Sequence, residues 1–537
     1  MSKLVALRKI PECTCTRLFP GLPFELEGTP IGVFAQGSMT NIFFNLFSTP
    51  NLDGRNMAYQ VSPRLHNEDL APAKERNWGA FSIFNVWTSD VHSLYGYFLA
   101  ASLFLVAGGG LKFLFSIAVG STVVYFLMTM VGNAGVKTGV PYPVLARASF
   151  GVFGANIPAL VRAVVATFWY GAQTSAAAGA IVSFLVRYEG MKSFNESGTW
   201  LDHTPLEVVC YLGVWAAQLL IISKGMETVR RFMDFAGPAV WAMMLLLAVG
   251  LSIKAGTISF NVDMDPQALA DLAKNQTGFS VTPGSIAAMF AVAATWVTYF
   301  AALYLNFCDF SRFSPSKESL KKGNLWGLPV NLILFSVVAA LTTASAYKVY
   351  GEVLLEPGAI AAKFDSVFLA LLAMLTFAVA TLGINVVANF VSPAYDFANV
   401  APNKIDFKKG GYIAAGIALL LYPLHPWDNA PAFVNAIGST MGPLFGIIMV
   451  DYYLLRKAQV DVDALYTEDK SGPYFFQSGF NMIAIAAALI GSVFSSFLPI
   501  WGPASYDKFS PYGWFLGVLV AGVAYWALNG GKTPHKK

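Results

Sequence analysis

The chain has 537 residues, of which 55% are hydrophobic and 12% are charged, and its net charge is +4. A soluble protein carries about twice that charged fraction, and a soluble chain of this length would divide into several domains with polar surfaces. Because there is too little polar sequence to cover such surfaces, lipid is the expected solvent for much of the chain. The modest charge is not clustered in one block, which argues against a nucleic-acid partner.

Apolar segments long enough to cross a membrane recur along the whole chain. A spanning helix needs about 20 mostly apolar residues, and twelve segments meet this requirement with Gly, Pro and charged residues between them. They are 80–106, 112–133, 156–186, 205–222, 235–254, 286–306, 326–347, 366–391, 410–424, 431–455, 475–497 and 511–528. The sequence therefore predicts an all-α membrane protein with 12 transmembrane helices, of which the ninth is short and the third is long enough to tilt.

The Lys and Arg residues of the loops predict an orientation. If both termini are cytoplasmic, the inner loops hold fifteen Lys and Arg residues and the outer loops hold eight. Cytoplasmic loops of membrane proteins carry an excess of these residues. We therefore expect a multi-pass protein of the cell membrane (inner or plasma membrane) with both termini cytoplasmic, and with the lipid bilayer as a partner.

The domain boundaries follow from the same reading. A cytoplasmic N-terminal tail is expected over residues 1–74, a transmembrane domain over 75–528 and a cytoplasmic C-terminal tail over 529–537. Residues 1–56 lack a convincing signal peptide, so this segment is either a disordered tail or the product of a mis-assigned start codon upstream of Met57. The four cysteines form no disulfide or zinc pattern. No metal site or resident cofactor is assigned.

Polar residues inside a membrane span are costly and are functional candidates by default. The first span holds six of them around Trp87, namely Asn85, Thr88, Ser89, Asp90, His92 and Ser93. An unbroken helix could not turn all of these side chains away from lipid, so we expect a locally unwound helix that lines a cavity. The alternative is a polar seam packed against neighbouring helices. Asp90 and His92 can both carry a proton, or they cap and brace the break.

Two pairs of residues in later spans share a helix face because they are four residues apart. In the third span, Trp169 can stack on a flat ring, and the Gln173 amide can donate to and accept from a ring edge. In the sixth span, Trp296 and Phe300 offer a second aromatic face. For each of these residues, ordinary packing or a helix–helix hydrogen bond is the alternative. Arg162, deeper in the third span, is expected to pair near the cytoplasmic side.

The eighth span carries two amides at the same spacing, Asn385 and Asn389. Two buried amides on one face need hydrogen-bond partners. Those partners are either a substrate or neighbouring helices, and the sequence leaves both open.

Five ordered motifs carry a family resemblance over residues 74–528. They are Tyr142-Pro-Val-Leu-Ala-Arg-Ala-Ser-Phe-Gly151, Phe168-Trp-Tyr-Gly-Ala-Gln-Thr174, Asn306-Phe-Cys-Asp-Phe-Ser-Arg312, Ser392-Pro-Ala-Tyr395 and Gly442-Pro-Leu-Phe-Gly-Ile-Ile-Met-Val-Asp-Tyr-Tyr453. With these motifs the chain resembles the nucleobase–cation symporter-1 family, which includes hydantoin, allantoin, uracil, cytosine and purine permeases. The resemblance implies a leucine-transporter-like fold, in which helices 1–5 and 6–10 form inverted repeats and two further helices follow.

The resemblance also implies site residues. Trp169 and Gln173 match family residues that contact the substrate ring, and Asn389 matches one that binds it. Counting nine residues back from Asp309 places Phe300 at the position of a family Trp, with Trp296 one turn away. The substrate-binding candidates are Trp169, Gln173, Phe300, Trp296, Asn389, Asn385 and Ser93.

The coupling ion is a departure from the family pattern. Sodium-coupled members place two hydroxyl side chains on helix 8 where this chain has Gly383 and Ile384. Sodium, a hard cation, wants several oxygen ligands, so the loss of both hydroxyls favours H⁺ over Na⁺. The cation-coupling candidates are Ser89, Asp90, His92, Ala380, Gly383 and Ile384.

The resulting expectation is a symporter, not an enzyme, that imports a nucleobase-like cyclic amide, with uracil, hydantoin or allantoin favoured. A purine or cytosine permease of the same family is the alternative, and a channel or a non-transporting receptor is a more distant one. A monomer is one reading, and the sequence leaves the oligomeric state open.

Overall fold

The computed structural model describes residues 59–534, except 278–280, 428–432, 434–437, 504–505, 507–508 and 510. The chain divides into two units, 1–56 and 57–537, and only the second is described below. The two interpretations of residues 1–56, and the cysteines at positions 13 and 15, therefore lie outside the described residues. Within those residues the regular structure is helical, apart from two isolated β-bridges.

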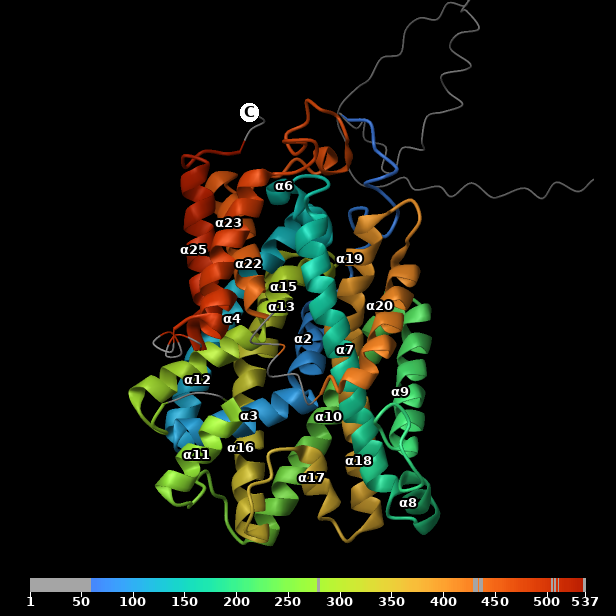
Figure 1. The fold of residues 1–537 in the computed structure, drawn as a ribbon, viewed down its shortest axis with the longest axis vertical. Helices are drawn as coiled ribbons and strands as arrows, with labels where there is room; N and C mark the ends of the chain where they lie inside the picture. Colours follow the sequence, from blue (N-terminus) through green and yellow to red (C-terminus); the bar gives the residue numbers. More distant parts are fainter. Residues whose placement is uncertain are drawn as a thin grey trace, which may run out of the picture. The chain divides into compact units, whose positions relative to one another are not determined.

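The first half of the described chain forms long helices with short helices between them (Figure 1). These elements are α2 (Ala80–Val91), α3 (Leu94–Ala107), α4 (Gly110–Thr138), α5 (Tyr142–Leu145), α6 (Arg147–Phe150), α7 (Asn156–Leu185), α8 (Glu189–Asn195), α9 (Pro205–Ser223), α10 (Met226–Ala255) and α11 (Pro266–Thr277).

The second half contains most of the broken or bent passes. Its elements are α12 (Ile286–Tyr299), α13 (Ala301–Asn306), α14 (Cys308–Ser311), α15 (Lys317–Leu325), η1 (Trp326–Val330), α16 (Asn331–Tyr350), α17 (Pro357–Ala362), α18 (Val367–Ile384), η2 (Asn385–Val391), α19 (Ser392–Val400), α20 (Phe407–Leu421), η3 (Tyr422–Leu424), η4 (Gly438–Thr440), α22 (Met441–Met449), η5 (Val450–Leu455), η6 (Asp463–Tyr466), α23 (Met482–Ser492), η7 (Val493–Phe497), α24 (Leu498–Trp501) and α25 (Gly513–Leu528).

The first pass is broken where the polar residues gather. Helix α2 ends at Val91, α3 begins at Leu94, and the two helices are bent by 68° relative to each other. The Ser93 hydroxyl accepts a hydrogen bond from the Gly96 N–H at 2.8 Å, which caps α3. Such a cap satisfies one of the free N–H groups at a helix start. The predicted interruption of the first span is confirmed.

A second break separates α12 from α13. Phe300 lies between the two helices with φ −85° and ψ 6°, so the predicted span 286–306 is not one continuous helix. Phe300 N–H donates to the Val297 carbonyl at 3.2 Å. Four long helices, α4, α7, α9 and α10, therefore lie between the two broken passes along the chain.

Four helical stretches of the described residues are long and apolar enough to cross a membrane by themselves, and the bent pair α2–α3 makes a fifth. The four are Gly110–Thr138, Met226–Ala255, Lys317–Tyr350 and Val367–Val400. Five of the remaining apolar helices among these residues are shorter. The length and the composition of the described helices therefore do not establish the predicted number of twelve spans.

The predicted start of the span at residue 475 is wrong. Helix α23 begins only at Met482, where the Asn481 side chain caps it. The preceding residues form a tight loop with a bridge between Gln477 and Phe480, and Gly479 has φ +90°, a conformation that favours glycine. The aromatic side chains of Tyr474 and Phe476 are buried within the protein at this loop and do not face lipid.

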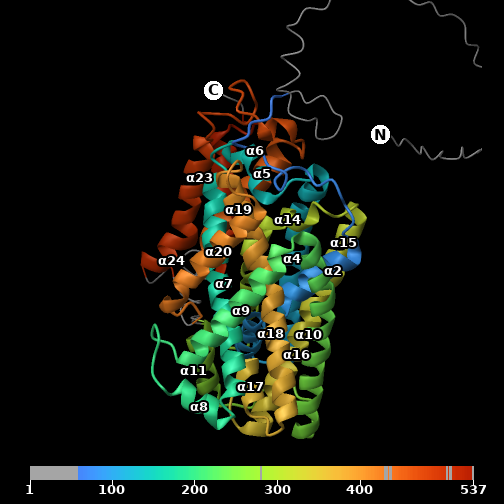
Figure 2. The same cartoon turned by 90° about the vertical axis from the view of Figure 1, so that its right-hand side faces the viewer.

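Both described ends of the chain lie at the same end of the helical unit (Figures 1 and 2). Before α2, Ser62 N–H donates to the Tyr466 carbonyl at 2.8 Å. After α25, the Thr533 hydroxyl donates to the Leu455 carbonyl, also at 2.8 Å. The segment from residue 59 to α2 packs on the helices, since Leu65 and Leu70 are fully buried.

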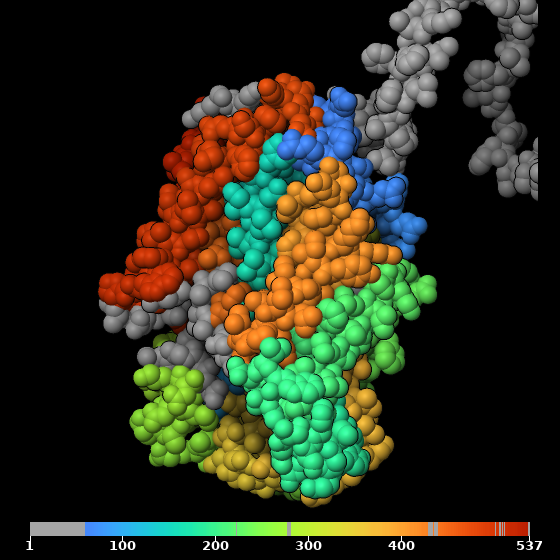
Figure 3. All heavy atoms as spheres, turned by 45° about the vertical axis from the view of Figure 1, so that its right-hand side comes forward, coloured from blue at the N-terminus to red at the C-terminus, as the bar shows by residue number. Residues whose placement is uncertain are grey.

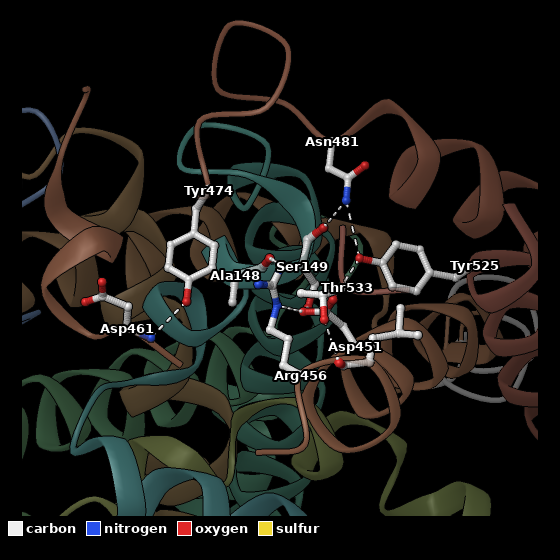
Figure 4. A network of polar contacts seen from close by, with 10 residues as sticks. Ala148, Ser149, Asp451, Arg456, Asp461, Tyr474, Asn481, Tyr525 and Thr533 are labelled. Atoms are coloured by element: carbon white, nitrogen blue, oxygen red, sulfur yellow. Dashed lines mark hydrogen bonds and ion pairs between the residues drawn. The ribbon is translucent and has the colours of Figure 1, made fainter. Parts of the chain in front are cut away.

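A buried ion pair ties the last helices to the rest of the unit (Figure 4). Asp451 accepts from Arg456 Nε at 2.7 Å, from the Ser149 hydroxyl at 3.0 Å and from the Tyr525 hydroxyl at 3.0 Å. Asn481 adds a bond to the Ser149 carbonyl at 2.7 Å. One carboxylate therefore joins η5, α6 and α25, which explains the acidic residue in the predicted motif that ends at Tyr453.

Segments far apart in the sequence form one face of the unit. Helices α7, α9 and α20 contact one another, and their teal, green and orange residues adjoin in the space-filling view (Figure 3). Helix α7 also packs against α18, η2 and α19. Residues of the third and eighth predicted spans are thereby brought together.

Candidate functional site

A connected group of aromatic rings lies beside the two helix breaks. The Tyr95 ring is 4.7 Å from the Trp169 ring and 6.2 Å from the Tyr299 ring, measured between centroids. Tyr299 in turn lies 5.6 Å from Trp296 and 5.1 Å from Phe300. The three predicted aromatic residues therefore belong to one group, which Tyr95 and Tyr299 connect.

The predicted aromatic residues differ in how much ring they offer to a ligand. Trp169 is half-buried, whereas Trp296 and Phe300 are 1% and 0% exposed. Phe300 packs edge-on to Trp87 at 6.4 Å, and the backbone of Gly120 on α4 approaches the Trp296 side chain. In this conformation Trp169 alone among the three presents an accessible ring.

The two amides of the eighth predicted span have different surroundings. Asn385 Nδ2 donates to the Tyr170 carbonyl and to the Thr174 hydroxyl, each at 3.2 Å, so this side chain joins η2 to α7. Asn389 Nδ2 donates to Asn385 Oδ1 at 2.9 Å. Asn385 thus has neighbouring helices as partners, and it orients Asn389.

Gln173 carries an unused hydrogen-bond acceptor. Its side chain is 1% exposed, and Oε1 has no hydrogen-bond partner. A buried polar atom without a partner costs about 1–3 kcal/mol unless something occupies its acceptor site. Trp169 and Gln173 lie one turn apart on α7, so the accessible ring and the unused acceptor are close together.

A cavity of about 510 Å³ opens beside this region, at the end of the unit opposite to the described chain ends. Its wall includes Leu94, Ala176 and Trp427. Leu94 directly follows the first break, and Ala176 lies about one helical turn from Gln173. The Trp427 ring is 6.0 Å from the Tyr95 ring. Trp427 therefore lies between the cavity and the aromatic group, and none of the predicted substrate-binding residues lines the cavity itself.

The predicted cation-coupling residues come from two elements that meet. A Cβ atom on Gly383 would lie 3.6 Å from the Ser89 Cβ and 3.7 Å from the Ser89 carbonyl oxygen, both ordinary contacts. The Ser89 hydroxyl is buried without a partner. Ala380 and Ile384 are also buried on the same helix, α18. Helix α18 therefore approaches α2 just before the break.

The side chains of Asp90 and His92 have different neighbours. His92 Nε2 lies 3.0 Å from Asn331 Oδ1, and its ring packs against Trp241 and Phe335 at 4.9 and 5.1 Å. Asp90 is buried, its Oδ2 has no hydrogen-bond partner, and the charge that acts on it is that of Arg162. The predicted proton-carrying pair therefore occupies two separate environments.

Ser93 is already engaged at the break. Besides capping α3, its hydroxyl lies 3.0 Å from the Tyr299 hydroxyl, which joins the first broken pass to the second. Arg162, which was expected to pair, has backbone carbonyls and an amide as partners. Its guanidinium bonds to the carbonyls of Ala302 and Ala388 and to Asn306 Oδ1, and no ion pair of Arg162 occurs among the described residues.

Sequence reasoning missed Tyr95, Tyr299 and Trp427. Tyr95 lies two residues after the break and Tyr299 one residue before the other, so their position beside a break was the available signal. Trp427 follows the short helix η3, where a single aromatic residue carries no pattern.

Two interrupted helices, with polar groups gathered at the first interruption, are typical of secondary membrane transporters. Residues 71–521 match the family described as permeases for cytosine/purines, uracil, thiamine and allantoin. The chain belongs to this family. It is a permease, which is a non-enzymatic membrane protein.

Curated relatives cover most of the chain. The allantoin permease of Bacillus subtilis is 33% identical over 479 residues, which cover 87% of this chain and 93% of the relative. The purine–uracil permease of Arabidopsis thaliana is 29% identical over 87% of this chain and 78% of its own length. The identity and coverage of the allantoin permease are by themselves sufficient to place this chain in the same family.

Solved structures show the same fold. A nucleobase–cation-symport-1 family transporter in a closed conformation, with bromovinylhydantoin bound, aligns with a TM-score of 0.66 at 23% identity and covers 86% of this chain and 94% of its own. A Na⁺-coupled sialic acid symporter in a substrate-bound outward-open state aligns with a TM-score of 0.58 at 11% identity, over 88% and 94% of the two chains.

Proposed function

We propose that the protein is a symporter that imports a small cyclic amide, with uracil, hydantoin or allantoin favoured as the substrate. The carrying observation is the pair of Trp169 and Gln173 on α7. A half-buried indole offers a stacking face, and the unpartnered Oε1 of Gln173 offers an acceptor to a ring N–H. Asn389 on η2 is the proposed second group that reads the ring edge, oriented by Asn385.

The relatives support this substrate class. An allantoin permease is 33% identical, and a similar fold binds bromovinylhydantoin. Both ligands contain a five-membered hydantoin ring in which N–H and C=O groups alternate. A purine or cytosine is the second candidate, because a purine–uracil permease is 29% identical over most of the chain.

The proposed coupling ion is H⁺. Gly383 and Ile384 supply no hydroxyl where helix α18 approaches Ser89, so a sodium ion there would rely on backbone carbonyls and the Ser89 hydroxyl. Sodium, as a hard cation, wants more oxygen ligands than that. Asp90, Ser89 and Ala380 remain the proposed coupling positions, and we assign His92 a bracing role.

The proposed architecture has twelve spans, arranged as two inverted repeats of five and two additional helices. Two observations support it: the breaks at residues 92–93 and at Phe300 fall five passes apart, and the described chain ends lie at one end of the unit. We propose that this end is cytoplasmic, that residues 1–74 and 529–537 belong to the cytoplasmic tails, and that the protein lies in the cell membrane as a monomer.

The proposed mechanism is alternating access. A substrate enters through the outer cavity, stacks on Trp169 beside Tyr95, and bonds to Gln173 and Asn389. Movement of the broken helices then closes the cavity and opens the inner side. Phe300 and Trp296, which are covered in this conformation, are proposed to complete the aromatic site as the helices move.

A thermal-shift panel on purified protein tests this proposal. Uracil, hydantoin, allantoin, cytosine and adenine are added with and without sodium, because a ligand that binds the folded state raises its stability. We expect a stabilising cyclic amide whose effect does not need sodium and is lost in Gln173→Ala. Gln267→Ala, an exposed amide change in α11, is the matched control and keeps the response. A panel without any stabilising base contradicts the proposal.

A further inference from the structure

A buried polar stripe runs from the candidate substrate site toward the inner end of the unit. On the pass formed by α18, η2 and α19, Asn385, Asn389, Ser392 and Asp396 are spaced four, three and four residues apart, which keeps side chains on one helix face. Their exposures are 0%, 5%, 0% and 0%. Asp396, the charged member of this stripe, has no place in the substrate site.

The Asp396 carboxyl is fully buried and both of its oxygens lack a hydrogen-bond partner. The charged groups that act on it are Asp309, at the inner end of α14, and Arg162 on α7. An ionised carboxylate without hydrogen bonds is very costly in a medium of low polarity. The protonated acid avoids that cost.

Other unused polar atoms gather around Asp396. Among the described residues, Arg162 Nη1, Asn306 Nδ2, Asp309 Oδ2 and the Tyr142 hydroxyl are buried and have no partner. Their elements are in mutual contact, since Tyr142 N–H donates to Asp309 Oδ1 at 2.8 Å and Arg162 bonds to Asn306. Buried unsatisfied groups require an explanation, such as water or an ion, and several in one place indicate a hydrated site.

The charges around the site determine what it can hold. Arg162 is within reach of three carboxylates, those of Asp396, Asp309 and Asp90, and Arg312 is the second cation that acts on Asp309. Tyr142 and Cys308 are the neutral titratable neighbours. Three carboxylates and two guanidinium groups leave one excess negative charge, which one proton neutralises. Two adjacent guanidinium groups disfavour a metal cation.

Asp396 is the favoured position for that proton. Asp309 already accepts a hydrogen bond from the Tyr142 N–H, which stabilises its charged form. Asp396 has no such bond on either oxygen. The charged form of Asp396 is therefore the more costly of the two.

We infer that Asp396 is the binding site of the co-transported proton, with Asp309 and Arg162 setting its affinity. This inference rests on the proposed proton symport, and it assigns the proton itself to Asp396 on α19 in place of Asp90 among the proposed coupling positions. On release, the O–H bond of Asp396 breaks, the electron pair stays on the carboxylate, and the proton passes to water on the inner side.

The position of Arg162 connects this site to inner opening. Its guanidinium bonds at 3.2 Å to the Ala302 carbonyl on α13 and at 2.7 Å to the Ala388 carbonyl on η2. These bonds hold the second broken pass against the eighth pass above Asp396. When α13 moves away, the bonds break and Asp396 becomes accessible to inner water.

Infrared difference spectroscopy between acidic and alkaline buffer tests the site without a substrate. Wild-type protein should lose the carbonyl-stretch band of a protonated carboxylic acid as the pH rises. Asp396→Asn should lack this band, whereas the exposed control Glu318→Gln should retain it. Asp309→Asn should move the loss of the band to lower pH, because a neighbouring negative charge is removed. If Asp396→Asn does not fold, the Asp309→Asn variant still tests the inference.

Transport in proteoliposomes supplies the functional readout. We expect Asp396→Asn to exchange labelled substrate across the membrane at a rate near that of wild type, but to lose accumulation driven by a proton gradient. A band or an accumulation ratio that is unchanged in Asp396→Asn would overturn the inference. If the band behaves as expected while no cyclic amide binds the wild type, the proton site stands and the proposed substrate fails.

Discussion

His92 Nε2 and Asn331 Oδ1 are 3.0 Å apart across the interface between the first break and α16. The Trp241 indole N–H, which can only donate, bonds to the same oxygen at 2.7 Å, and this bond fixes the orientation of the Asn331 amide. An amide oxygen only accepts, so Nε2 of His92 carries its proton in this arrangement. The imidazole acts as a neutral hydrogen-bond donor that braces the break.

This bracing role predicts the behaviour of His92→Gln. A Gln amide can still donate to Asn331, so the pH dependence of uptake should match that of wild type, while stability should fall by about 1–2 kcal/mol because the ring packing is lost. Uptake at several pH values and the thermal unfolding midpoint measure the two effects. Uptake that becomes independent of pH would instead assign proton coupling to His92.

Removal of the Trp169 ring should weaken substrate binding. Stacking of a base on an aromatic side chain contributes roughly 1–3 kcal/mol, so Trp169→Ala should raise the dissociation constant about tenfold or more. Trp200→Ala, which removes an exposed ring outside the site, is the control and should leave affinity unchanged. Equal affinities of Trp169→Ala and wild type would remove this residue from the site.

Restoring hydroxyls on α18 should change the coupling ion. A Cβ on Gly383 meets Ser89 only at ordinary contact distances, so Gly383→Ser combined with Ile384→Thr should fold and should place two further oxygens beside Ser89. We predict that sodium then stabilises the double variant in thermal unfolding and stimulates its uptake. Wild-type protein that already responds to sodium as strongly would show that backbone carbonyls suffice for a sodium site.

The Asp451 network predicts a stability difference between two changes. Asp451→Ala leaves Arg456 buried without its partner, and breaking a buried pair in this way costs about 3–5 kcal/mol. Tyr525→Phe removes one hydrogen bond and should cost about 1 kcal/mol. Chemical or thermal unfolding of the purified variants gives both values, and equal effects would mean that the ion pair is not the dominant contact.

The sequence predicted the first break because six polar side chains in one span cannot all avoid lipid in a straight helix. It could not predict the separate surroundings of Asp90 and His92. Residues two apart point to different neighbours, and which neighbour each meets depends on the packing of α7, α10 and α16. Arg162 was expected to pair, but the sequence does not show that its partners are the backbone carbonyls of Ala302 and Ala388 and the amide of Asn306.

Two other features depended on tertiary contacts that no local pattern carries. Phe475 and Phe476 extended the predicted span to residue 475, although they belong to the loop that precedes α23, in which Phe476 is buried. Asp396 directly follows the motif Ser392-Pro-Ala-Tyr395, and the sequence did not single it out. Its isolation from hydrogen-bond partners appears once α19 is packed against α7 and α5.

Uptake of labelled allantoin and uracil into proteoliposomes tests the central proposal most directly. We expect saturable accumulation that is driven by an inward proton gradient, collapses with a protonophore, does not need sodium, and falls at least tenfold in Gln173→Ala. Accumulation that requires a sodium gradient would contradict proton coupling. No accumulation of any cyclic amide or nucleobase under either gradient would contradict the proposed transport function itself.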